Sequence, residues 1–137
     1  MNIDIKAMLC RVVDQVFDED FTVADVSSKD EPWLHCVHVS RADKDRTAII
    51  RASYEWIDAF VPELNVQATL FDYDDVELEK EADLLRLCRV MRAYLEGNGH
   101  VEERRRLFRR GTNSVLRIEA DGLVWRLGRN HYVVPYP

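Results

Sequence analysis

The sequence predicts an α+β domain, in which an antiparallel sheet of about six or seven strands is covered mainly on one side by an N-terminal helix, a short helix and one long helix. Three observations lead to this expectation: a long amphipathic segment in residues 74–96, several short segments with alternating apolar residues, and an Asp-Gly turn between two such segments. No linker or internal repeat divides the 137 residues. We therefore expect a single globular domain over residues 1–137.

Composition and cysteine usage indicate a soluble cytoplasmic protein. Apolar residues make up 47% of the chain, which is enough for a packed core. No apolar run approaches the roughly 18–20 residues that span a bilayer, and Met1–Lys6 has neither a basic leader nor a hydrophobic run typical of a secretory signal. Cys10, Cys36 and Cys88 are odd in number and far apart, so we expect no disulfide framework.

Two segments have the periodicity of amphipathic helices. From Ile5 to Phe17 an apolar residue recurs every three or four positions, and Asn2 or Asp4 can cap the start. The second helix is expected within Asp74–Glu96, where acidic residues precede arginines in the order that complements the helix dipole. Gly97 lies where a left-handed residue would end it. The apolar stripe of this helix is Leu84, Leu87, Cys88, Met91, Tyr94 and Leu95.

Short apolar segments in the first half of the chain predict strands and one short helix. The strand segments are Phe21–Val26, Trp33–Ser40, Thr47–Ala52 and Asn65–Phe71. The first three are joined by brief polar links, which predicts an antiparallel meander. Between the third and the fourth, Ser53 can cap a short helix over Tyr54–Phe60, which Pro62 would end.

The chain after residue 99 returns to β character. Val115–Glu119 and Leu123–Leu127 flank an Asp121-Gly122 pair, which suits the positive φ angles of a tight hairpin turn. His100–Arg110 fits either an arginine-rich edge strand or a helix, and the turn-like residues on both sides favour the strand. The apolar tail, residues 132–136, contains a proline and would form an edge.

No residue pattern predicts catalysis, a cofactor or a metal site. His35, Cys36 and His38 are the densest cluster of metal-ligand types, but alternate residues of a strand point to opposite faces, so the three do not converge. Cys10 and Cys88 lie on or beside apolar stripes, as small core residues do. Nucleophile-elbow, zinc-protease and phosphate-loop motifs are absent from the sequence. We therefore expect a non-enzymatic protein.

The net charge of −6 is unevenly distributed. Residues 1–100 hold 21 acidic and 11 basic residues, whereas residues 101–137 hold 4 and 8. Seven of the acids lie within Asp72–Asp83. A favourable helix N-terminus explains part of this excess, and a docking surface for a basic protein explains the rest. The candidate contact residues are Asp72, Tyr73, Asp74, Asp75, Glu77 and Glu79, followed by Tyr54 and Trp56.

A basic run near residue 108 provides an alternative surface. Its residues are Arg104, Arg105, Arg106, Arg109 and Arg110. They could contact phosphates while Phe108 stacks on a base, but Glu102 and Glu103 adjoin them and the rest of the chain is acidic. The same run could instead protect a sheet edge from aggregation, or bind an acidic partner that includes a second copy of this chain. Nucleic-acid binding is therefore not the favoured interpretation.

A small acidic α+β domain without a catalytic motif resembles, in general style, the immunity proteins of bacterial toxin systems. This resemblance implies a cytoplasmic bacterial protein that binds one cognate toxin domain and blocks its active site by steric and electrostatic occlusion. The element order up to Glu96 is also similar to that of small acidic secretion chaperones, which form homodimers and hold an effector. A nucleic-acid-binding regulator using the arginine run, and an enzyme using His35 or His38, remain as alternatives from other classes.

Overall fold

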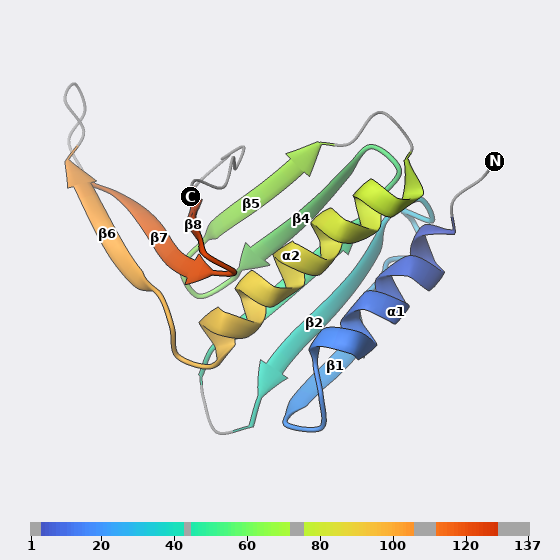
Figure 1. The fold of residues 1–137 in the computed structure, drawn as a ribbon, viewed down its shortest axis with the longest axis horizontal. Coiled ribbons are helices and arrows are strands. Elements are labelled where there is room, and N and C mark those ends of the chain that lie inside the picture. Colours follow the sequence, from blue (N-terminus) through green and yellow to red (C-terminus); the bar gives the residue numbers. More distant parts are fainter. Residues whose placement is uncertain (1–3, 43–44, 72–75, 106–111, 129–137) are drawn as a thin grey trace.

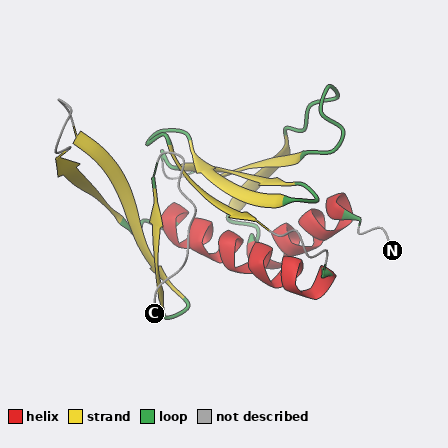
Figure 2. Cartoon of the chain, turned by 90° about the horizontal axis from the view of Figure 1, so that it is seen from above, coloured by secondary structure: helices red, strands yellow, loops and turns green. Residues whose placement is uncertain are grey.

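Two helices lie side by side on one face of a five-stranded antiparallel sheet (Figures 1 and 2). The computed structural model describes residues 4–42, 45–71, 76–105 and 112–128. The helices are α1 (Ile5–Val16) and α2 (Glu77–Leu95). The strands pair in sequence order and are β1 (Phe21–Asp25), β2 (His35–Arg41), β3 (Thr47–Ala52), β4 (Trp56–Val61) and β5 (Val66–Phe71). The predicted α+β class is confirmed.

Both predicted amphipathic helices form and bury the predicted stripes. Asp4 caps α1 by accepting a hydrogen bond from the Ala7 amide at 3.0 Å, and all six residues of the α2 stripe are buried. Gly97 has a φ of 103°. Its amide and that of Asn98 donate to the carbonyls of Tyr94 and Ala93, each at 3.0 Å, and so end α2 in the manner of a Schellman motif. Neither helix of the described residues is long and apolar enough to cross a membrane.

The short helix predicted over Tyr54–Phe60 is wrong, because this segment contributes most of strand β4. Ile57, Ala59 and Val61 alternate on the face that the helices cover, and all three are buried. On the opposite face Asp58 is buried and Trp56 and Phe60 are half-buried. Because both faces are covered, the residues of this strand do not show a period of two. Ser53 closes the β3–β4 turn by exchanging hydrogen bonds with the backbone of Trp56, and does not cap a helix.

A second, three-stranded sheet packs against α2 and the start of β5, so the single sheet predicted from the sequence is wrong. Its strands are β6 (His100–Arg105), β7 (Thr112–Ala120) and β8 (Leu123–Leu127). The predicted hairpin is confirmed, with φ angles of 53° at Asp121 and 75° at Gly122. Gly128 forms a β-bridge with Gln67 and so joins the two sheets. The apolar tail over residues 132–136 lies outside the described residues.

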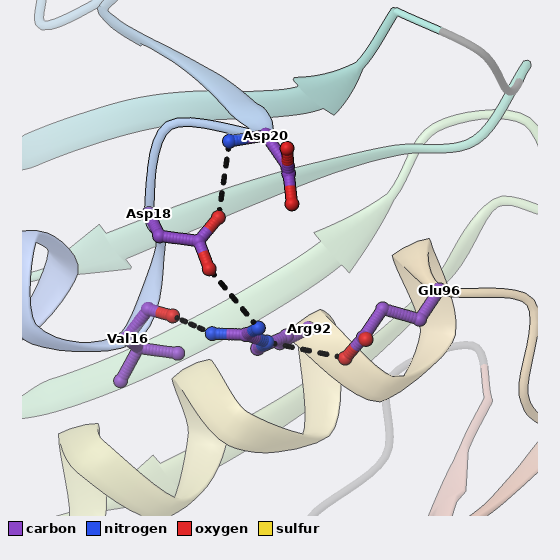
Figure 3. A network of polar contacts seen from close by, with 5 residues as sticks. All are labelled: Val16, Asp18, Asp20, Arg92 and Glu96. Atoms are coloured by element: carbon purple, nitrogen blue, oxygen red, sulfur yellow. Dashed lines mark hydrogen bonds and ion pairs between the residues drawn. The ribbon is translucent and has the colours of Figure 1, made fainter.

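Arg92 of α2 forms hydrogen bonds with the C-terminal end of α1 and with the turn that follows it (Figure 3). Its guanidinium donates to the carbonyl of Val16 at 2.6 Å, to Asp18 at 3.3 Å and to Glu96 at 3.1 Å. The carbonyls at the end of a helix have no partner within the helix, and this one is satisfied by a charged donor. The two helices are therefore held together by polar contacts at one end of their apolar interface. An ion pair between Arg11 and Glu81, at 2.7 Å, joins them elsewhere.

A second polar cluster joins the end of α2 to two strand connections. Glu63, between β4 and β5, accepts hydrogen bonds from the amide and hydroxyl of Thr47 at 2.7 and 2.8 Å and from the hydroxyl of Tyr94 at 2.7 Å. Arg46 lies over the Tyr94 ring, 4.6 Å from its centroid. Partial burial raises the pKa of Glu63, but the hydrogen bonds to its carboxylate outweigh burial, and the net pKa lies below the ordinary value.

Replacing Tyr94 by phenylalanine is expected to lower the free energy of unfolding at neutral pH by about 1.5 kcal/mol, because a hydrogen bond to a carboxylate is lost. A carboxylate whose folded-state pKa is depressed stabilises the protein above its unfolded-state pKa, and that contribution disappears as the pH falls through the folded-state value. The stability difference between the two proteins should therefore shrink on acidification below the ordinary carboxyl range. Urea unfolding at a series of pH values measures it, with Tyr54→Phe as the control. A difference that is independent of pH would contradict this assignment.

Candidate functional site

Exposed aromatic and aliphatic side chains gather at the end of the five-stranded sheet where α2 begins. At this end β1, β3 and β5 finish, β2 and β4 start, and the loop between β1 and β2 projects (Figures 1 and 2). We call it the aromatic end and define it by the exposed residues Trp33, Tyr54, Phe71 and Leu78 and the half-buried Trp56. Trp33 is 57% exposed and Leu78 is 80% exposed. Exposed side chains of this size are costly to solvate and typical of contact surfaces.

A buried lysine fixes the position of Tyr54. Lys80, in the first turns of α2, is buried, and its ammonium donates a hydrogen bond to the backbone carbonyl of Tyr54. The tight β3–β4 turn is closed by the hydrogen bond from the Ser53 amide to the Trp56 carbonyl, at 2.9 Å. As a result the Tyr54 turn and the N-terminus of α2, which are distant in sequence, are held against each other while the Tyr54 side chain stays exposed.

Trp56 and Phe71 lie on the sheet face opposite the helices, next to a satisfied polar group. The two residues are directly opposite each other in the β4–β5 pairing. On the same face, Asp58 is only 2% exposed. It accepts two hydrogen bonds from Arg51, at 2.9 and 2.8 Å, and one from the Thr69 hydroxyl at 2.8 Å. The Arg51 guanidinium also lies 5.5 Å from the Trp56 ring centroid. A buried charge with these partners holds its surroundings rigidly, so Trp56 has a defined platform.

Acidic side chains surround the aromatic end. Glu77 and Glu79 occupy the first turn of α2, where the helix dipole favours them. Glu31 and Glu55 are exposed on the two neighbouring loops. Hydrogen bonds from Ser27 hold the pKa of Asp25 below its ordinary value, so this carboxylate, at the end of β1, is charged at neutral pH. The exposed bases nearby are Lys29, in the loop between β1 and β2, and Lys6, in the first turn of α1, which leaves an acidic balance among the described residues of this end.

The structure brings together four of the predicted contact residues. Tyr54 and Trp56 come from the β3–β4 turn and β4, and Glu77 and Glu79 come from the start of α2. Asp72, Tyr73, Asp74 and Asp75 lie outside the described residues. Sequence reasoning missed Trp33, Phe71 and Leu78. Leu78 could have been noticed because it interrupts an acidic run at a position off the apolar stripe, whereas the exposure of Trp33 has no clear sequence marker.

The histidine and cysteine residues do not form a cluster. Cys36 and His38 belong to the sheet face opposite the helices, and His35 to the other face, as alternation along β2 requires. Burial raises the pKa of the Cys36 thiol, which disfavours the thiolate. Within the described residues no group of three or more His, Cys, Asp or Glu side chains is arranged to hold a metal ion. Cys88 is a core residue as predicted, but Cys10 is exposed on α1, so that prediction was wrong.

The predicted basic surface can be placed only in part. The favoured strand interpretation of His100–Arg110 is confirmed for β6, which includes Arg104 and Arg105 and pairs with β7. Arg106, Arg109 and Arg110 lie outside the described residues. The described backbone thus puts the start of the arginine run on a strand of the smaller sheet, away from the aromatic end (Figure 1).

The chain was compared with protein-family models, with curated proteins and with solved structures, and none of them matches it.

Proposed function

We propose that this protein is a non-enzymatic protein-binding module that uses its aromatic end to cover a basic surface of a partner protein, as an immunity protein covers its cognate toxin. The observation that carries the proposal is the gathering of exposed Trp33, Tyr54 and Leu78 among acidic side chains at one end of the fold. Tryptophan and tyrosine are enriched among the residues that dominate binding energy. Surrounding carboxylates raise the association rate with a basic partner.

The rigid support of this surface fits the same function. Lys80 holds the Tyr54 turn against α2, and the Arg51–Asp58–Thr69 contacts support Trp56. Side chains presented on a fixed framework lose little conformational freedom on binding, which favours affinity. A partner that carries basic residues for contact with phosphates would be blocked when these carboxylates occupy the same positions. The mechanism is occlusion and requires no chemistry from this chain.

The secretion-chaperone alternative is less well supported by the fold. Its resemblance rested on a short helix after the third strand, and that segment contributes most of strand β4. Strand β4 therefore takes the place of that helix between β3 and β5, and a three-stranded sheet follows α2.

The proposal predicts that two truncations at the aromatic end abolish capture of one stoichiometric partner. We would immobilise the wild-type protein and a Trp33→Ala/Tyr54→Ala variant, and compare the proteins that each retains from the native cytoplasm. Loss of two dominant contacts of about 2 kcal/mol each should weaken binding by roughly a thousandfold. A Glu77→Gln/Glu79→Gln variant should bind more slowly, and the difference should diminish at high salt.

A Val101→Ala variant is the matched control, because Val101 is exposed to a similar extent but lies on β6. It should retain the partner as the wild type does. Addition of the wild-type protein should also inhibit the activity of the captured partner. Equal retention by the aromatic-end variant, or a partner whose activity is unaffected, would overturn the proposal.

A further inference from the structure

Three basic residues form a row across the three-stranded sheet. His100 of β6 lies directly opposite Arg117 of β7, and Arg117 lies directly opposite Arg126 of β8. Residues that are directly opposite each other in an antiparallel pair share one face of the sheet. Ile118 and Trp125, which adjoin the two arginines in sequence, are buried in the core. Because side chains alternate along a strand, the row lies on the other face, which we call the outer face of this sheet.

The carboxylates near this row do not balance the two arginines. Among the described residues, Arg117 forms ion pairs with Glu102 at 3.6 Å and with Glu119 at 3.8 Å. Both distances are too long for hydrogen bonds, and Glu102 also contacts His100 at 3.3 Å. In the part of the chain that the structure describes, Arg126 has neither an ion pair nor a hydrogen bond. Since like charges directly opposite each other destabilise a sheet, the row favours a further anion.

Both arginines also carry a buried donor that has no acceptor. The Nε atoms of Arg117 and Arg126 are buried and make no hydrogen bond. Elsewhere in the protein, Arg51 and Arg92 donate hydrogen bonds of 2.6 to 3.3 Å. A buried polar group without a partner is costly and uncommon, and a bound ion is one of its regular explanations. Two such donors on adjacent strands therefore indicate a ligand that accepts hydrogen bonds from both side chains.

The charge of the row indicates which anion would fit. Guanidinium groups bind carboxylates and phosphates through paired hydrogen bonds. Arg117 and Arg126 extend from Cα atoms that are only about 5 Å apart, so one small anion can meet both. A phosphate monoester carries a charge of about −1.5 to −2 at neutral pH and three acceptor oxygens. A carboxylate or a phosphodiester carries a single negative charge, so the monoester is the better match for two adjacent guanidinium groups.

We propose that Arg117 and Arg126 form a binding site for the phosphate monoester of a small molecule on the outer face of the three-stranded sheet. The Arg117 side chain is 33% exposed, so a ligand can reach the guanidinium from the solvent, and rotation of the side chain would present Nε to it. Arg126 is the stronger contact because no carboxylate of the described residues competes for it, whereas Glu102 competes for Arg117. The proposal does not depend on the function suggested above.

Titration of the full-length protein with inorganic phosphate tests the site. At pH 7.5 and constant ionic strength, the Nε–Hε NMR signals of Arg117 and Arg126 should shift and saturate with one dissociation constant. Arg126→Gln should raise that constant by roughly tenfold, because charge-assisted hydrogen bonds are lost. Glu102→Gln should lower it by about threefold, since a carboxylate that competes for Arg117 is removed. A purely structural role of Glu102 would not strengthen phosphate binding.

The matched control is Arg86→Gln. Arg86 also forms a long ion pair, at 3.7 Å to Asp83, but lies on α2, and its replacement should leave the phosphate affinity unchanged. The dispersion of the NMR spectrum verifies that each variant is folded. Shifts that fail to saturate, or that sodium chloride reproduces, would overturn the proposal. So would an unchanged affinity in Arg126→Gln, or an equal loss in Arg86→Gln. Tighter binding of a single-stranded oligonucleotide without a terminal phosphate would overturn the assignment to a monoester.

Discussion

Replacing Trp125 by alanine is expected to lower the free energy of unfolding by about 4 kcal/mol, since a buried aromatic side chain is removed and a cavity remains. Trp125 lies on β8, is 1% exposed and is directly opposite Ile118 of β7, which is also buried. These residues belong to the face of the three-stranded sheet that joins the main core. The substitution therefore removes contacts that hold this sheet against the rest of the molecule. Urea unfolding followed by circular dichroism measures the change.

Two further variants distinguish loss of packing from a general effect of substitution on β8. Trp125→Phe keeps much of the apolar volume and should cost about half as much. Leu123→Ala removes a side chain on the same strand that is only partly buried, and should cost less than either. A loss of under about 1 kcal/mol for Trp125→Ala would show that the three-stranded sheet unfolds separately from the main core.

Replacing Gly99 by alanine is expected to lower the free energy of unfolding by about 3 kcal/mol. Gly99 has a φ of 89°, which L residues rarely adopt. A Cβ atom at this position would lie 2.9 Å from Cγ1 of Ile118 and 3.1 Å from the carbonyl oxygen of Arg117. Ile118 is fully buried and its strand is held on both sides, so neither neighbour can move easily. Backbone strain and overpacking therefore act together.

Gly122→Ala is the matched control for Gly99→Ala. Gly122 also has a positive φ, of 75°, but no atom lies within 4 Å of an added Cβ. Its replacement should cost about 1 kcal/mol, from backbone strain alone. Thermal and urea unfolding of the two variants measure the difference, which is the contribution of crowding. Equal losses would contradict the close approach of the β6 start to β7.

The sequence predicts best those elements in which one face alone is buried. The α2 stripe is buried against a sheet while the opposite side is solvated, so its period is visible in the residues. The Asp121-Gly122 hairpin can be predicted equally well, because positive φ angles restrict the residue types of a tight turn. Strand β4, in contrast, cannot be recognised as a strand from its residue pattern. Asp58 is buried on one of its faces and Ile57 on the other, and a strand buried on both faces has no alternation to read.

The gathering of residues at the aromatic end could be predicted only in part. An acidic run with nearby aromatics led to Tyr54, Trp56, Glu77 and Glu79, and the structure brings their elements to one end. Their proximity depends on the direction in which each strand of the sheet runs. Because the sequence predicts a helix where β4 lies, it does not reveal the directions of β4 and β5. Exposure of Trp33 follows from strand β2 starting at His35, and element boundaries are the least certain feature of any sequence-based prediction. The role of these residues in binding stays a prediction.

The contact between Arg92 and the Val16 carbonyl spans 76 positions in sequence, whereas the strands of the five-stranded sheet pair in the order in which they are synthesised. Helix α1 can meet β2 and β3 as soon as they emerge from the ribosome. Arg92, which donates to the carbonyl in the last turn of α1, is synthesised only after about two thirds of the chain has been made. Closing so long a loop costs chain entropy, at about 0.6 kcal/mol for each doubling of its length. During synthesis the last turn of α1 is therefore made long before the side chain that bonds its terminal carbonyl.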